Sequence, residues 1–173
     1  MPTFEENDGA ARQVVELAAL ACCDLFAAYG VPLSRAEHAA DTDYDLLYCG
    51  VMGFVGKNAR GMCLLGASRE PIERTAPVAG DLRDWLGELT NQLVGRLKGK
   101  LLARGVEIAL TTPLVLKGHH IAPLPRRQLI PEVLVGSCGR VLLWADVETA
   151  PGFSLTLESE ESVTLSEGGL LFF

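Results

Sequence analysis

The sequence has no long hydrophobic run and no cluster of basic residues, and both absences narrow the classes of function. No apolar stretch approaches the roughly 20 residues that a transmembrane helix needs. The first residues, MPTFEENDGA, are too acidic and polar for a signal peptide. A net charge of −7 without a block of Lys or Arg argues against nucleic-acid binding. We therefore expect a cytoplasmic protein that neither inserts into a membrane nor binds nucleic acid.

The cysteines and histidines lack the spacing of a metal or redox site. The five cysteines include no CxxC pair, and each lies in an apolar segment: Cys22, Cys23, Cys49, Cys63 and Cys138. This pattern favours reduced thiols packed in the core over a redox or metal role. His119 and His120 are adjacent and would point apart in a strand, and His38 is the only other histidine. We predict no metal site.

Two further motifs also fail as catalytic signatures. GVMGFVGKNARG is rich in glycine, but it lacks the order G-x-x-x-x-G-K-[ST] of a phosphate-binding loop. Ser137 and Cys138 have no evident base partner, so a turn or core position is the expected use.

The remaining features predict one ordered domain over residues 1–173. A hydrophobic content of 49% with 21% charged residues excludes intrinsic disorder. Helical periodicity predicts one long helix from Gly9 to Tyr29 and a second from Asp81 to about Ala103, with Asp81 as its N-cap and Gly105 as its terminator.

Strand signals lie between and after these helices. They predict a hairpin from about Asp45 to Leu65, strands over 106–118 with a break near Pro113, and a second hairpin over 131–148. A short helix is expected in residues 68–77. Residues 151–173 mix strand-like and loop-like patterns and stay unassigned.

The exposed face of the second long helix carries an unusual set of residues. At about 100° per residue, Asp84, Gly95 and Glu88 lie roughly 20°, 40° and 60° from Asn91. The leucines gather on the opposite side, as expected for a buried stripe: Leu82, Leu86, Leu89, Leu93 and Leu97. Glu88 and Asn91, three residues apart, are therefore neighbours on the exposed face.

Glycines occupy the same helix at Gly87, Gly95 and Gly99, although each costs about 0.5–1 kcal/mol relative to alanine. A bare helix beside a carboxylate and an amide suits a surface on which another macromolecule docks. The alternative is a solvated face whose glycines pack against the first helix.

The segment DLRDWLGELTNQLVGRLKGKLLARGVEIALTTPLVLKG resembles the signature region of the CheC/CheX/FliY chemotaxis phosphatases, most closely CheX. The likeness includes the pattern D-x-x-x-E-x-x-N-x-x-x-G at Asp84, Glu88, Asn91 and Gly95, and it covers roughly Gly9 to Val147. With the order of elements above, it implies an α+β fold with a largely antiparallel sheet and two long helices side by side on one face.

The resemblance implies a phosphatase that acts on the aspartyl phosphate of a CheY-like response regulator. Asn91 would orient the attacking water, and Glu88 would accept a hydrogen bond from a lysine of the regulator. Asp84, Gly95 and Lys98 would contact the same partner. The protein would need no cofactor of its own, because the regulator holds the Mg²⁺.

Only the second helix should be active. Family members with two sites carry E-x-x-N on both long helices, whereas here Ala19 follows Glu16 in place of the asparagine. Two other functions remain open: a non-catalytic adaptor that binds a regulator or a flagellar or receptor-modifying partner through the same helix, and a structural dimerisation module.

CheX-like proteins are typically homodimers joined at sheet edges, which implies a homodimer here. The apolar stretches 132–138 and 140–148 contain no internal proline or lysine to blunt an exposed edge, so both are candidate edge strands.

Overall fold

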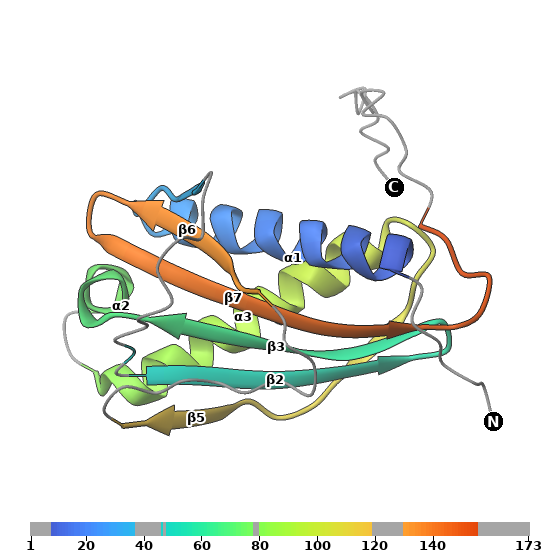
Figure 1. Ribbon diagram of the computed structural model, residues 1–173. Coiled ribbons are helices and arrows are strands. Elements are labelled where there is room, and N and C mark those ends of the chain that lie inside the picture. The colour runs from blue at the N-terminus through green and yellow to red at the C-terminus, as the bar shows by residue number, and fades with distance from the viewer. Residues whose placement is uncertain (1–7, 37–45, 47, 78–79, 119–129, 156–173) are drawn as a thin grey trace, which may run out of the picture.

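The computed structural model describes residues 8–36, 46, 48–77, 80–118 and 130–155, which form ten helices and strands (Figure 1). The helices are α1 (Asp8–Ala28), α2 (Arg69–Thr75) and α3 (Leu82–Leu102). The strands are β1 (Ser34–Arg35), β2 (Tyr48–Gly56), β3 (Ala59–Ala67), β4 (Ile108–Leu110), β5 (Leu114–Lys117), β6 (Glu132–Gly136) and β7 (Gly139–Thr149).

The strands form one sheet in the order β1-β6-β7-β3-β2-β4, and every pairing is antiparallel. The outer edge of β2 is shared by two short strands. β4 pairs with residues 54–56 and β5 with residues 48–51, so the predicted break near Pro113 separates them. The two predicted hairpins are β2–β3 and β6–β7. The prediction of a largely antiparallel α+β fold is confirmed.

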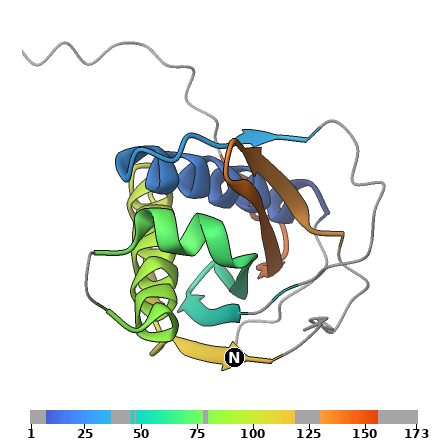
Figure 2. The ribbon, with the colours of Figure 1, turned by 90° about the vertical axis from the view of Figure 1, so that its left-hand side faces the viewer.

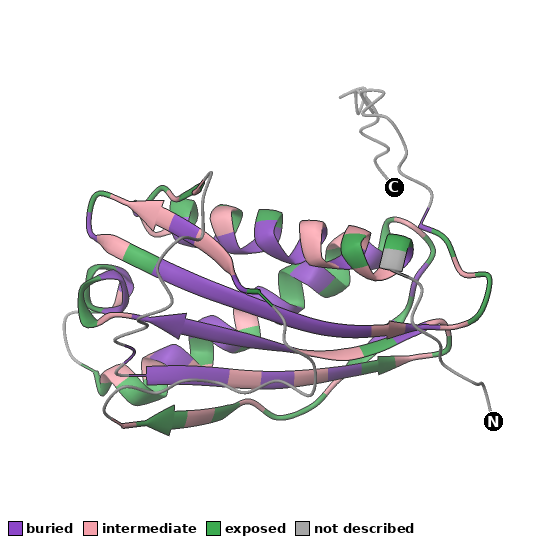
Figure 3. Cartoon of the chain, in the orientation of Figure 1, coloured by how far each residue is buried: buried purple, intermediate pink, exposed green. Residues whose placement is uncertain are grey.

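Both long helices cover the same face of this sheet (Figure 2). α1 packs against β7, and α3 packs against β2, β4 and β5. The predicted leucine stripe of α3 is buried against the sheet at Leu86, Leu89, Leu93 and Leu97, and Leu82 at the helix start is half-buried (Figure 3). Burial of these side chains, each worth about 1.5–3 kcal/mol, offsets the glycines of the helix.

α3 approaches the sheet closely at one point. A Cβ atom added to Gly50 of β2 would lie 2.0 Å from the Thr90 Oγ1 atom. Thr90 itself is fully buried, and its hydroxyl donates to the Leu86 carbonyl at 2.7 Å. Because Thr90 directly precedes Asn91, this contact sets the height of that part of the helix above the sheet.

The helix ends follow the predicted signals. The Asp81 side chain caps α3 by accepting from the Arg83 backbone N–H at 2.8 Å. Gly105 follows the helix with a φ of 74°, and Gly30 follows α1 with a φ of 75°. Positive φ is accessible to glycine without steric cost, so Gly105 ends α3 as predicted and Gly30 ends α1 in the same way.

The prediction that residues 140–148 form an edge strand is wrong. β7 lies in the interior of the sheet, between β6 and β3. Its side chains are buried on both faces: Val141 and Leu143 pack under the helices, and Leu142 and Trp144 pack in a second cluster on the opposite face. A continuous apolar run reflects this two-sided burial rather than an exposed edge.

The other candidate edge, β6, is covered by the chain itself. Ser34 and Arg35 of β1 pair with Val135 and Leu134, and the Ala36 N–H donates to the Val133 carbonyl at 2.9 Å. The outer edge of β6 is therefore occupied along most of its length.

The cysteines are free thiols, as the sequence predicts. Four are buried and Cys23 is half-buried. Burial raises the pKa of Cys49 to about 11 and that of Cys63 to about 12, so these thiols stay protonated at neutral pH.

Several predictions concern residues that the structure does not describe, and others concern the absence of a metal site or a membrane helix. His38, His119, His120 and residues 156–173 are not described. In the described ranges, no group of three or more His, Cys, Asp or Glu side chains is placed to hold a metal ion. None of the three described helices combines the length and apolarity needed to cross a bilayer.

Candidate functional site

The predicted pair of Glu88 and Asn91 lies on the solvent-facing side of α3, and both side chains are exposed. Asp84, Gly95 and Lys98 are exposed on the same helix. The structure therefore places the whole predicted set on α3, at the surface rather than in an enclosed cavity.

An open groove of about 440 Å³ runs beside this pair, between α3 and the segment that enters β5. The helix contributes Arg83, Asp84, Gly87, Glu88 and Asn91 to its lining. The opposite wall consists of Pro113, Leu114 and Val115. Leu114 is 59% exposed, so this wall offers apolar surface next to the two polar side chains.

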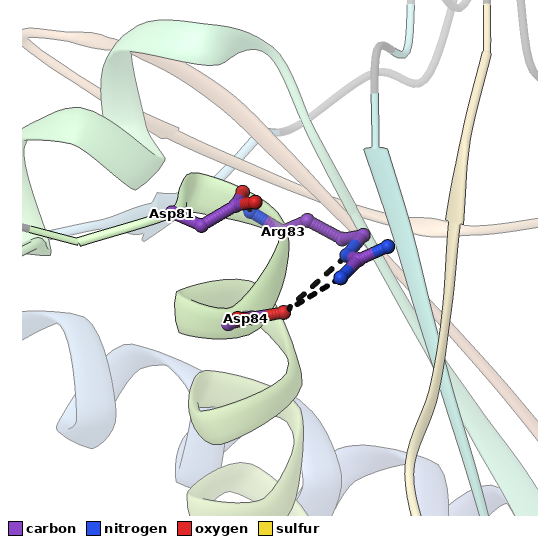
Figure 4. Close-up of polar contacts among 3 residues, drawn as sticks. All are labelled: Asp81, Arg83 and Asp84. Atoms are coloured by element: carbon purple, nitrogen blue, oxygen red, sulfur yellow. Dashed lines mark hydrogen bonds and ion pairs between the residues drawn. The ribbon is translucent and has the colours of Figure 1, made fainter.

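Arg83 brings a positive charge to the groove. Its side chain faces that of Asp84 (Figure 4). Its Nη2 and Nε atoms lie 3.2 and 3.3 Å from the Asp84 Oδ1 atom. Both side chains are more than half exposed, so this ion pair contributes little to stability.

Glu88 forms a hydrogen bond with a neighbour on its own helix. The Gln92 Nε2 atom donates to the Glu88 Oε1 atom at 2.9 Å. The Gln92 Oε1 atom in turn accepts from the Tyr29 hydroxyl at 2.9 Å. Tyr29, which lies 63 positions from Gln92 in the sequence, therefore contributes to the environment of the predicted site.

The helix glycines fall into two kinds. A Cβ atom at Gly87 would contact the Val115 Cγ2 atom at 3.3 Å, so this glycine lets β5 approach the helix. A Cβ atom at Gly95 or Gly99 would meet no atom of a neighbouring element within 4 Å in the described part of the chain. Packing therefore accounts for Gly87 but for neither of the other two, and their helix backbone is left open to solvent.

Lys98 lies apart from the groove. It lines a second hollow of about 250 Å³ with Leu102, Glu107 and Ile108, at the start of β4. The groove brings together Asp84, Glu88 and Asn91. Gly95 lies one turn beyond Asn91. Lys98 is closer to the C-terminal end of the helix.

The corresponding face of α1 is organised differently. Glu16 forms an ion pair with Arg35, which also lies 3.3 Å from Glu132 of β6. Ala19, at the position of the missing asparagine, is 1% exposed. The carboxylate on α1 is therefore already paired and the position three residues later is buried, in contrast to the open pair on α3.

One known family matches part of the chain. Residues 48–128, which include α3 and the groove, match the family described as chemotaxis phosphatase CheX. Over this segment the chain is similar to the CheX family. This match confirms the resemblance to the CheC/CheX/FliY phosphatases. No curated protein matches the chain.

Solved CheX structures share the fold. The CheX chemotaxis protein from Vibrio vulnificus is 17% identical, with a TM-score of 0.66 over 80% of this chain and 98% of that one. CheX from Desulfovibrio desulfuricans is 15% identical, with a TM-score of 0.65 over 78% and 99%. CheX in a CheX–CheY–BeF3–Mg²⁺ complex from Borrelia burgdorferi is 11% identical, with a TM-score of 0.53 over 79% and 94%.

Sequence reasoning missed the parts of the site that come from elsewhere in the chain. The apolar wall at Leu114 and Val115 depends on β5 pairing with β2 beneath α3, which no local pattern reveals. Gln92 had a detectable signal, because it follows Glu88 by four residues and such pairs are neighbours on a helix. Its bond to Tyr29 had none.

Proposed function

We propose that this protein hydrolyses the phosphoryl-aspartate of a CheY-like response regulator by inserting the exposed face of α3 into the regulator's active site. The observation that carries the proposal is the exposed Glu88/Asn91 pair on a helix with open backbone at Gly95, beside a groove with an apolar wall. A partner can approach this face closely, and the two polar side chains can reach into it.

Asn91 is the proposed catalytic residue. Its amide both donates and accepts, so it can hold one water in line with the phosphorus atom. The water oxygen attacks phosphorus, the bond between phosphorus and the aspartate oxygen breaks, and inorganic phosphate and a free carboxylate result. A loose, largely dissociative transition state needs no strong base, so positioning supplies the acceleration.

Glu88 is the proposed docking contact. A carboxylate at this position can accept a charge-assisted hydrogen bond from a lysine near the regulator's phosphorylation site. The Mg²⁺ that neutralises phosphoryl charge would come with the regulator, since the Borrelia burgdorferi complex combines CheX with CheY, BeF3 and Mg²⁺. Asp84 and Gly95 would lie at the rim of this contact, and Lys98 would meet the partner beyond it.

We also propose a homodimer. β5 borders the groove, so a dimer formed at that edge would crowd the proposed docking face. A dimer that leaves both sites open would use the opposite end of the sheet, where β1 lies outermost. Closed two-fold pairing is the commonest assembly for a chain of this kind.

A non-catalytic adaptor that binds a regulator through the same helix is the second candidate. The intact Glu88/Asn91 pair favours catalysis over this role, because an adaptor has no need of an exposed water-orienting amide.

The decisive experiment measures the decay of phosphorylated CheY-like proteins from the same genome, with and without this protein. We expect faster loss of phosphate from at least one regulator. Binding without any change in the decay rate of every regulator would contradict the phosphatase and support the adaptor.

A further inference from the structure

We infer that Gln92 and Tyr29 are positioning residues for Glu88, so that α1, whose own E-x-x-N copy is incomplete, supports the site on α3. The inference rests on the proposed function of Glu88 as the docking contact. Neither residue would touch the regulator's reacting atoms.

The hydrogen bonds fix the orientation of the Gln92 amide. Glu88 in its ionised form can only accept, so the Gln92 nitrogen must face it, and it does so at 2.9 Å. The Gln92 oxygen then faces the Tyr29 hydroxyl, which donates at 2.9 Å. A reversed amide would place two oxygens against each other at Glu88. The chain from Tyr29 to Glu88 therefore has one consistent arrangement.

Tyr29 is itself held from two sides. It follows the last residue of α1, where its backbone N–H donates to the Phe26 carbonyl at 3.1 Å. Its ring contacts Trp85 of α3 edge-on, with centroids 5.4 Å apart and an interplanar angle of 89°. The Trp85 Nε1 atom donates at 3.0 Å to the hydroxyl of the buried Thr75. The contacts that hold Glu88 in place therefore extend to the end of α1 and to α2.

This arrangement prepares Glu88 for docking. One carboxylate oxygen is occupied by Gln92, and Oε2 accepts no hydrogen bond within the described part of the chain, so it is available to a partner cation. A glutamate on an exposed helix otherwise loses rotamer freedom when it binds. Holding it beforehand lowers that entropic cost and so strengthens docking.

The test is a double-mutant cycle on affinity for a CheY-like regulator loaded with BeF3⁻ and Mg²⁺. Tyr29→Phe removes one hydroxyl and keeps the ring against Trp85. We expect about a fivefold loss of affinity, the scale of one hydrogen bond. In a Glu88→Ala background the same substitution should have no effect, because the residue through which it acts is gone. Gln92→Leu should behave like Tyr29→Phe.

Tyr48→Phe is the matched control, since it removes the same atom from a buried tyrosine in β2, and we expect unchanged affinity. If Tyr29→Phe weakens binding equally with and without Glu88, its role is structural and the inference fails. If Tyr29→Phe and Gln92→Leu bind like the wild type while Glu88→Ala binds weakly, the inference fails and the proposed function stands. If Glu88→Ala itself binds normally, the proposed docking role fails first.

Discussion

At the scale of single residues, the proposed chemistry depends on an amide that the protein exposes at its surface. Asn91→Ala removes this amide from an exposed helix position. We expect the regulator's phosphate to decay at its intrinsic rate, a loss of about 100-fold or more in acceleration, because water is no longer held in line. Stability should rise by about 0.5 kcal/mol, because alanine is the better helix former. Single-turnover decay and thermal unfolding measure the two effects.

Asn91→Asp sharpens this test, since it keeps the shape of the side chain but places a negative charge against the phosphoryl group. It should be as inactive as the alanine variant. Wild-type acceleration by either folded variant would remove Asn91 from the mechanism.

Glu88→Ala should weaken binding as well as turnover, because a charged pair across an interface contributes to affinity. We expect about a tenfold loss of affinity for the BeF3⁻-loaded regulator, measured by calorimetry. Glu73→Ala removes an exposed carboxylate from α2 and serves as the control. Unchanged affinity together with unchanged turnover in Glu88→Ala would show that this carboxylate is outside the site.

At this scale the sequence predicts some parts of the site and not others. Glu88 and Asn91 were accessible from helical periodicity and family resemblance, since both depend on spacing within one element. The bond between Tyr29 and Gln92 was not, because it depends on how α1 and α3 lie against each other.

At the scale of elements, the open backbone of α3 leads to a prediction in which the stability of the protein rises while regulator binding weakens. Gly95→Ala should stabilise the protein by about 0.5–1 kcal/mol, since the added methyl group meets no neighbouring element in the described structure. The same methyl group should weaken regulator binding, because it stands one turn from Asn91 on the docking face. Denaturant unfolding and calorimetric binding are the two measurements.

Gly99→Ala is the matched control, because it lies one turn farther from Asn91 and is equally open. It should give the same gain in stability with a smaller effect on affinity. A Gly95→Ala variant that is more stable and binds normally would contradict docking over that part of the helix.

The first helix should contribute nothing through its own carboxylate. Glu16→Ala breaks an exposed ion pair with Arg35, so we expect a stability loss of about 0.2–1 kcal/mol and an unchanged phosphatase rate. The rate of regulator dephosphorylation tests this directly. A large loss of activity in a folded Glu16→Ala variant would mean that the face of α1 takes part in the reaction.

The elements show where sequence patterns stop being informative. The two long helices and both hairpins were predictable because periodicity, caps and turns are local. The position of β7 was not, because an apolar strand without lysine or proline suits either an edge left open or an interior strand buried on both faces. Long-range pairing with β3 decides between them.

At the scale of the whole molecule, we predict a homodimer that binds two regulators. Light scattering over a concentration series should give twice the 18.5 kDa mass of one chain. Titration with BeF3⁻-loaded regulator should reach one regulator per chain without dissociating the dimer, if assembly leaves both grooves open. A monomer at every concentration would contradict the dimer, and dissociation on titration would place the interface at the groove.

The close approach of Thr90 to Gly50 has a consequence for how this protein can evolve. Any side chain at position 50 must displace Thr90, since even a methyl carbon would lie 2.0 Å from its hydroxyl oxygen. Such a displacement would move Asn91 relative to the groove wall on β5, although position 50 itself is buried and never meets a partner. Selection for activity would therefore constrain this glycine as strictly as a residue of the site. A mutational scan for activity would count position 50 among the functional positions.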